Sequence, residues 1–168
     1  MKKEKLLARL RQLYLLEFIN ISLLPCCAWI YALTRGHAIG LNSMVAMVLN
    51  GIVLLEGSYF WFSLRRHLKL GNQNSFVNIF KKAKLLNFIL LPLAFIFIMI
   101  NPFLGAFDKI TTTLFFLLAV LEHVNYFEVQ LMYDNKNDLK YIRQYGRLKV
   151  SKLNRAMKNN ALDQAGLL

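Results

Sequence analysis

Cysteine is nearly absent from this 168-residue chain, which has only Cys26 and Cys27. Adjacent cysteines are poorly placed to bridge each other, so no disulfide framework is implied. We expect the two thiols to be small apolar packing residues. No Cys or His spacing typical of a metal site occurs, and no Gly-rich phosphate loop or nucleophile elbow occurs either. These absences leave no motif that names an enzyme or a cofactor, and we predict no cofactor.

Acidic residues are also few, with 9 Asp and Glu against 21 Lys and Arg, which gives a formal net charge of +12. A strongly basic chain can bind nucleic acid, but here the basic residues flank apolar stretches and form no recognisable nucleic-acid-binding module. Anionic lipid headgroups are therefore the expected partner, and nucleic acid is not.

Long apolar runs are what the chain has in abundance, at 57% hydrophobic residues and a mean hydropathy of +0.40. Four stretches contain few charged residues and approach the ~20 residues that cross the hydrocarbon of a bilayer. The sequence thus predicts an all-α membrane protein, a four-transmembrane-helix bundle in residues 1–133 followed by a basic cytoplasmic tail in residues 134–168. The expected spans are residues 13–33, 44–64, 85–102 and 110–133.

The distribution of basic residues predicts the orientation. Apart from Arg35 and Lys109, every Lys and Arg precedes the first span, lies between the second and third, or follows the fourth. The positive-inside rule then places both termini in the cytoplasm, for a multi-pass protein of the cell (inner) membrane. The N-terminal segment resembles a signal peptide, but Glu17 and Asn20 interrupt its apolar core, so we expect it to stay attached.

Fragments of the first half recur in the second half in the same order, as expected of a duplicated helical hairpin. The matched segments are 15–19 with 85–89, 23–25 with 90–92, and 55–60 with 121–127. The match pairs Glu17 with Asn87 and Glu56 with Glu122. Two such hairpins would enter the membrane from the same side, as a parallel repeat. The alternative is chance similarity among leucine-rich segments.

Polar residues inside the predicted spans are the strongest candidates for function, because an ionisable group there costs about 2.5–3.5 kcal/mol on insertion scales. We expect their side chains to face the bundle interior, to pair with donors or to stay protonated. Four of these residues are glutamates: Glu17, Glu56, Glu122 and Glu128. The helical rise places them in the cytoplasmic half of the membrane. Because the fourth span carries most of these residues, we expect it to be central in the bundle or at an oligomer contact. The predicted cluster comprises Glu17, Asn20, Glu56, Tyr59, Glu122, His123, Asn125, Tyr126 and Glu128.

Three functions remain open for this cluster. The favoured one is a structural network in an accessory membrane component, as a homo-oligomer or beside another membrane subunit. The second is an oligomeric proton- or cation-coupled transporter or channel that uses Glu56 and Glu122. The third is a membrane-embedded enzyme or metal site, with Glu56, Glu122, His123 and Glu128 as weak ligand candidates. A di-iron bundle uses Glu-x-x-His, whereas Glu122 and His123 are adjacent, so a metal site and an enzyme are disfavoured.

Basic residues beside the second connection and in the tail are expected to face anionic lipid. For the tail, the alternatives are that it docks a cytosolic protein or that it is only a topology signal on a solvated helix. The expected lipid-facing residues are Lys81, Lys82, Lys84, Arg143, Arg147, Lys149 and Lys152.

Overall fold

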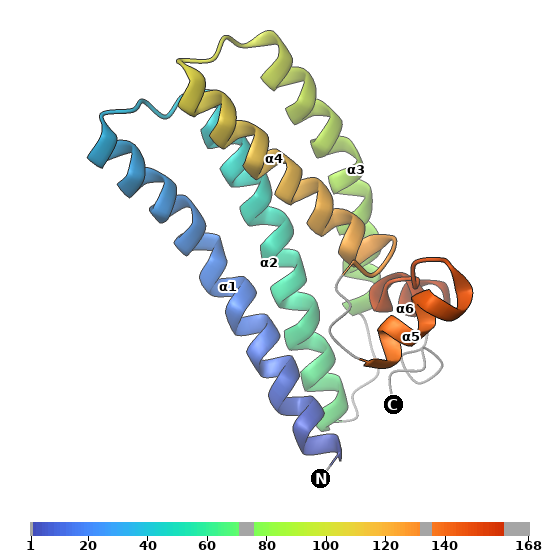
Figure 1. Ribbon diagram of the computed structural model, residues 1–168. Coiled ribbons are helices and arrows are strands. Elements are labelled where there is room, and N and C mark those ends of the chain that lie inside the picture. Colours follow the sequence, from blue (N-terminus) through green and yellow to red (C-terminus); the bar gives the residue numbers. More distant parts are fainter. Residues whose placement is uncertain (1, 71–75, 132–135, 160–168) are drawn as a thin grey trace.

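The computed structural model describes residues 2–70, 76–131 and 136–159, and in these residues the fold is all-helical (Figure 1). The prediction of an all-α chain with four helices long and apolar enough to cross a membrane is confirmed. The four long helices are α1 (Lys2–Arg35), α2 (Leu41–Leu70), α3 (Phe76–Ile100) and α4 (Ala106–Phe127). Two short helices follow, α5 (Lys136–Tyr145) and α6 (Lys152–Asn159).

The ends of two helices show where the sequence controls the fold. Helix α1 stops at Gly36, whose φ of 66° is left-handed and favours glycine, and His37 N donates to Ala32 O at 2.9 Å. Helix α4 ends at Phe127, although the apolar stretch predicts a span that reaches residue 133. The expected domain boundary between residues 133 and 134 lies outside the described residues.

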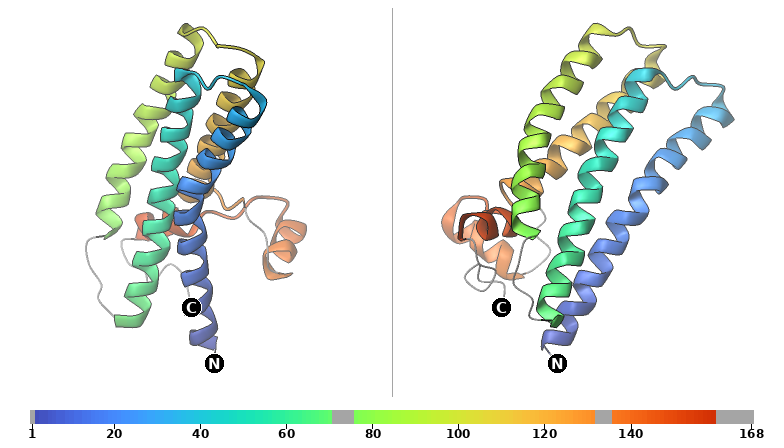
Figure 2. Two further views of the ribbon diagram at one scale, coloured as in Figure 1. Left: turned by 90° about the vertical axis from the view of Figure 1, so that its left-hand side faces the viewer. Right: turned by 180° about the vertical axis from the view of Figure 1, so that it is seen from behind.

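Helix α2 is the central helix of the bundle. It packs against α1 and α4 along much of its length and against α3 more briefly, whereas α3 and α4 hardly touch. Figure 2 shows α3 and α4 diverging from each other. The fourth span is therefore not the central helix, and its expected alternative place, at an oligomer contact, stays a prediction. Small and short polar residues on α2, including Ser43, Ala46 and Gly57, are buried and allow close approach from two sides.

Helices α2 and α4 run in the same direction with a register that is fixed at both ends. Ser43 Oγ lies 3.0 Å from Thr112 Oγ1, 69 residues further along the chain. Gly57 faces the ring of Tyr126 at the same sequence separation. This register places the buried Asn50, halfway between Ser43 and Gly57, level with Ala119.

The molecule has two distinct ends, which we name by what they carry. The loop end holds the α1–α2 and α3–α4 connections, and the tail end holds the start of α1 together with α5 and α6 (Figure 2). Helix α6 buries Leu153 and Met157 in a hydrophobic core at the tail end. Because all four long helices contribute to this core, α6 closes that end of the bundle. Their contributions include Leu10, Phe60, Phe80 and Phe127.

Candidate functional site

Residues from three helices meet near the tail end, and we call them the tail-end cluster: Glu17 of α1, Trp61 of α2, and Glu122 and Tyr126 of α4. Trp61 Nε1 donates a hydrogen bond to Glu17 Oε1 at 2.7 Å. The hydroxyl group of Tyr126 lies close to the Glu17 carboxyl group, since a Cβ atom at Gly57 would meet both. Glu122 precedes Tyr126 by one helical turn on α4. Two carboxyl groups from different helices therefore lie beside one phenol inside the bundle.

Gly57 makes room for this arrangement. A Cβ atom at this position would overlap the hydroxyl end of Tyr126 and the Glu17 Oε2 atom. Glu17 Oε2 is itself buried without a well-formed hydrogen bond. A buried polar atom without a partner is unfavourable, so the tail-end cluster is tightly packed but not fully satisfied.

Glu56 lies in a different place from the other predicted carboxyl groups. Asn87 Nδ2 of α3 donates a short hydrogen bond to Glu56 Oε2. Successive residues of a helix are about 100° apart around its axis, and Gly57 faces α4, so Glu56 is turned toward α3. The structure therefore does not bring together Glu56 and Glu122, the pair on which the transport hypothesis depends.

Three predicted residues on the last turn of α4 have local partners. Asn125 Nδ2 reaches Glu122 Oε2 at 3.5 Å, and Asn125 Oδ1 accepts a hydrogen bond from Leu131 N at 2.9 Å. His123 is buried with its ring 5.0 Å from that of Phe127. Glu128 is exposed and forms an ion pair with Lys84 of α3, with Nζ and Oε1 2.6 Å apart.

The two remaining predicted residues lie away from the tail-end cluster. Tyr59 is half-exposed on α2, and its ring packs against Phe80 at 5.7 Å between centroids. Asn20 is half-buried on α1. Of the nine predicted residues, the structure therefore gathers Glu17, Glu122 and Tyr126 into one cluster.

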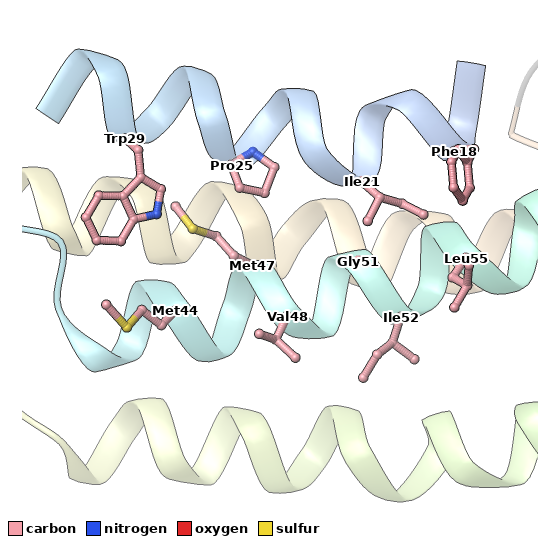
Figure 3. A pocket seen from close by; sticks show the side chains of 10 residues that line it. All are labelled: Phe18, Ile21, Pro25, Trp29, Met44, Met47, Val48, Gly51, Ile52 and Leu55. Carbon is pink, nitrogen blue, oxygen red and sulfur yellow. The ribbon is translucent and has the colours of Figure 1, made fainter. Parts of the chain in front are cut away.

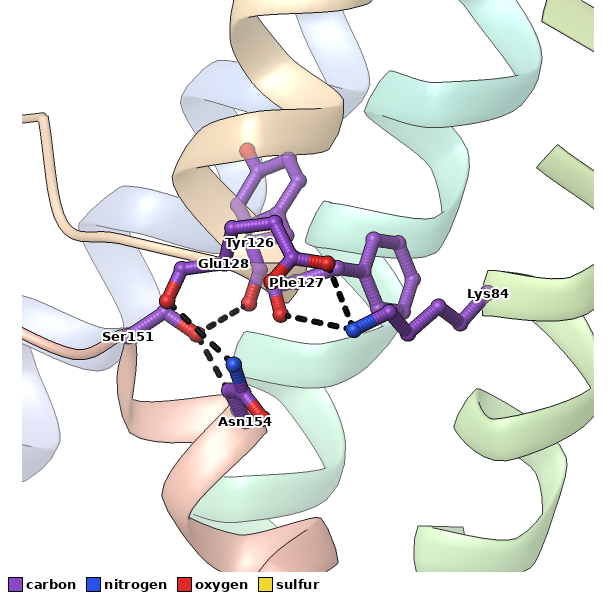
Figure 4. Close-up of polar contacts among 6 residues, drawn as sticks. All are labelled: Lys84, Tyr126, Phe127, Glu128, Ser151 and Asn154. Carbon is purple, nitrogen blue, oxygen red and sulfur yellow. Dashed lines mark hydrogen bonds and ion pairs between the residues drawn. The ribbon is translucent and has the colours of Figure 1, made fainter. Parts of the chain in front are cut away.

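Helix α6 contacts the tail-end cluster from the end of the bundle (Figure 4). Ser151 Oγ donates to Tyr126 O and accepts a hydrogen bond from Asn154 N at 3.0 Å, which caps α6. Asn154 Nδ2 donates to Glu128 O at 3.3 Å. The ammonium group of Lys152 lies 5.8 Å from the ring centroid of Trp61. The tail thus touches two residues that engage the buried carboxyl groups.

A second polar cluster at the loop end was missed by the sequence-based prediction. Asp108, near the start of α4, is 1% exposed. Its Oδ1 accepts hydrogen bonds from Gly40 N at 2.9 Å and Ser43 Oγ at 2.6 Å, and its Oδ2 accepts one from Leu104 N at 3.1 Å. We call these residues the loop-end clamp, because they join the α1–α2 connection to the α3–α4 connection.

A second contact strengthens the loop-end clamp. Asn42 Nδ2, near the start of α2, donates to Asn101 O at 3.1 Å in the opposite connection. A Cβ atom at Gly40 would collide with the carboxylate of Asp108, so only glycine fits there. The sequence signal for this clamp was an Asp and an Asn in the first turns of the two helices that follow connections.

The geometry offers little for a metal ion. Among the described residues, no three His, Cys, Asp or Glu side chains lie together in a way that could hold one. Of the weak candidates, Glu56 faces Asn87, Glu122 faces Tyr126, and Glu128 pairs with Lys84. These carboxyl groups therefore serve separate interactions.

Two apolar hollows open on the sides of α2. One, of about 610 Å³, lies between α1 and α2 and is lined by residues that include Pro25, Trp29 and Met47 (Figure 3). The other, of about 530 Å³, lies between α2 and α3. Neither lining contains an acid, a base or a nucleophile, so the hollows offer room for apolar groups but no catalysis.

Four apolar helices place the chain in the class of multi-pass helical membrane proteins. Comparison with protein-family models, with curated proteins and with solved structures found no match. A functional assignment therefore depends on the contacts of the chain itself.

Proposed function

We propose that this chain is a structural or accessory component of the cell (inner) membrane, in which intramembrane carboxyl groups join the helices. One observation carries the proposal: three carboxyl groups each accept a hydrogen bond from a different helix or connection. Trp61 of α2 donates to Glu17 of α1. Asn87 of α3 donates to Glu56 of α2. The α1–α2 connection donates to Asp108 of α4.

The energetics of a lipid environment support this role. Lipid tails are as apolar as leucine, so helices in a membrane associate through packing and interhelical hydrogen bonds, each worth about 0.6 kcal/mol on average. Helix α3 packs little against α4, and its polar links include Asn87 to Glu56 and Lys84 to Glu128. An accessory protein that presents a fixed surface to a second copy or another membrane subunit needs such links.

A double-mutant cycle tests the structural role. Glu17→Leu and Trp61→Phe remove the two partners of the α1–α2 hydrogen bond, and the free energy of unfolding in detergent measures each change. We expect a coupling energy of about 1 kcal/mol between these sites. Trp29→Phe is the matched control, because Trp29 lines the apolar hollow and should show no coupling with Glu17. Zero coupling for Trp61 as well would overturn the proposal.

The proposed orientation places the tail end in the cytoplasm. The loop end carries Arg35 and Lys109, whereas all other Lys and Arg residues belong to segments at the tail end or beyond it. The positive-inside rule supports cytoplasmic termini. A reporter fused after Leu168 should read cytoplasmic and one inserted near Ala38 external, and the reverse result would contradict the orientation.

We further propose that the chain is a tandem duplication of a helical hairpin. The sequence match pairs Glu17 with Asn87 and Glu56 with Glu122. Glu17 of α1 approaches Glu122 of α4 through Tyr126, and Asn87 of α3 bonds Glu56 of α2. Matched residues thus make matched contacts, which supports duplication. The packing is unequal, because α1 follows α2 closely while α3 and α4 diverge.

A second candidate function is proton or cation transport by an oligomer. The observation that favours it is the pair of carboxyl groups, Glu17 and Glu122, at one phenol, together with the unsatisfied Glu17 Oε2. Intramembrane carboxyl groups near hydroxyl groups are typical of proton relays. On this hypothesis Glu17 replaces Glu56 as the partner of Glu122.

A further inference from the structure

The segment from Tyr141 to Val150, which joins the end of α5 to the start of α6, exposes an unusual mixture of side chains. Three apolar or aromatic ones are largely exposed: Tyr145 at 54%, Leu148 at 46% and Val150 at 41%. Arg143 and Arg147 of the same segment are exposed as well. This segment is not part of the four long helices, so exposure to lipid tails does not explain its apolar surface.

Contacts with the residues that follow α4 fix this segment at the tail end of the bundle. Gln130 N donates to Lys149 O at 2.8 Å, and Ser151 N donates to Glu128 O at 3.1 Å. Val129 and Val150 pair in an isolated β-bridge. Because α4 ends at Phe127, these bonds hold Val150 just beyond the last turn of α4. In a bilayer that α4 crosses, the segment would therefore lie at the depth where headgroups begin.

The structure also separates the basic residues by what they contact. Lys84 binds Glu128 and the Phe127 carbonyl, Lys152 lies over Trp61, and Lys149 lies over Tyr141 at 5.7 Å. These three lysines serve the fold. Arg143 and Arg147 are exposed beside the apolar side chains, and a guanidinium group can bind phosphate with two parallel hydrogen bonds.

We propose that residues 141–150 form a docking surface for the anionic headgroups of the leaflet at the tail end. Arg143 and Arg147 bind lipid phosphate groups, and Tyr145, Leu148 and Val150 enter the interfacial layer. Aromatic and basic side chains together are typical of segments that lie in this layer. Charge complementarity favours a bilayer over a protein partner, since an anionic leaflet attracts basic residues beside a membrane-spanning helix. The proposal does not depend on the structural role of the carboxyl groups.

Fluorescence quenching in nanodiscs tests this surface with the full-length chain. A fluorophore is attached at Gln144→Cys, an exposed position beside the surface, in a Cys26→Ser and Cys27→Ser background. Nanodiscs contain phosphatidylcholine with brominated acyl chains, with or without phosphatidylglycerol. We expect stronger quenching when phosphatidylglycerol is present, and loss of this difference at high salt, because salt screens attraction at a surface.

Charge removal then tests whether the two arginines hold the surface against anionic lipid. Arg143→Gln with Arg147→Gln should abolish the dependence of quenching on phosphatidylglycerol. Arg35→Gln with Lys109→Gln removes the same charge at the loop end and should leave the dependence on phosphatidylglycerol intact. Leu148→Ser should weaken the quenching in both lipids while the arginines are kept. Equal quenching in the two lipids, or a dependence that survives the loss of both arginines, would overturn the proposal.

Discussion

The loop-end clamp and the tail-end cluster both bury carboxyl groups, but they satisfy them in different ways. Asp108 receives two backbone N–H groups and one hydroxyl group, so both of its oxygens have partners. Glu17 and Glu122 instead have side-chain donors, Trp61 and Asn125, and Glu17 Oε2 lacks a well-formed bond. Backbone donors are fixed by the chain, whereas side-chain donors can rotate. The loop end is therefore a rigid clamp, and the tail end is the adjustable part.

Removal of the Asp108 carboxylate should give the largest loss of stability. Asp108→Ala leaves the buried N–H group of Gly40 without an acceptor, at a cost of about 1–3 kcal/mol, and also removes the acceptor of the Leu104 N–H group. Unfolding in detergent, followed by circular dichroism, measures the change. Thr113→Ala is the control on the same helix, because its hydroxyl is exposed and bonds only its own helix at Lys109 O. Equal losses of stability in the two variants would show that Asp108 contributes no more than an exposed residue does.

A methyl group at Gly57 should give the next largest effect. Gly57→Ala pushes against Tyr126 and Glu17, and overpacking of this kind costs about 1–3 kcal/mol. Gly51→Ala is matched to it on the same helix, since a Cβ there would lie 3.7 Å from Ile21 Cγ2, an ordinary contact. If thermal unfolding in detergent shows the same midpoint for both variants, the close packing of the tail-end cluster is not real.

The α2–α3 link should contribute less. Asn87→Leu leaves Glu56 without its donor and should destabilise the protein by about 0.6 kcal/mol, with ~1.7 kcal/mol as the upper end for such bonds in membranes. Adding Glu56→Leu should recover stability, because removing both partners is less harmful than leaving one unpaired. Denaturant titration of the single and double variants measures this, and a double variant worse than Asn87→Leu would contradict the link.

The ion pair of Lys84 and Glu128 should contribute least. Both side chains are partly exposed, at 34% and 47%, so solvent screens the attraction. Glu128→Gln should cost less than about 1 kcal/mol, and the cost should shrink as salt is added. Unfolding at low and high salt measures it. A large loss of stability that salt does not change would contradict the view that the tail end is the adjustable part of the bundle.

Long apolar runs made the four helices predictable, because the length of hydrocarbon to be crossed constrains every span in the same way. Asp108 was not predictable from such patterns. Two of its partners are backbone groups of Gly40 and Leu104, which carry no side-chain signature. Contacts made by the backbone emerge only once the two connections are placed side by side.

The separation of Glu56 from Glu122 has a similar physical reason. Both were predicted to face the bundle interior, but α2 has two interior faces because α3 and α4 pack on different sides of it. Gly57 faces α4, whereas Glu56, one residue earlier on α2, faces α3. The docking of Leu153 and Met157 was also missed, since their burial depends on space between helices and not on the local pattern.

Flux of protons and cations into proteoliposomes tests the central claim most directly, with wild-type protein beside Glu122→Gln. A structural role for the carboxyl groups predicts no flux above that of protein-free vesicles in either sample. Glu122→Gln should remain folded by circular dichroism, so that a negative result refers to a native bundle. Flux in the wild type that Glu122→Gln abolishes would contradict the structural role and establish the tail-end cluster as a pathway.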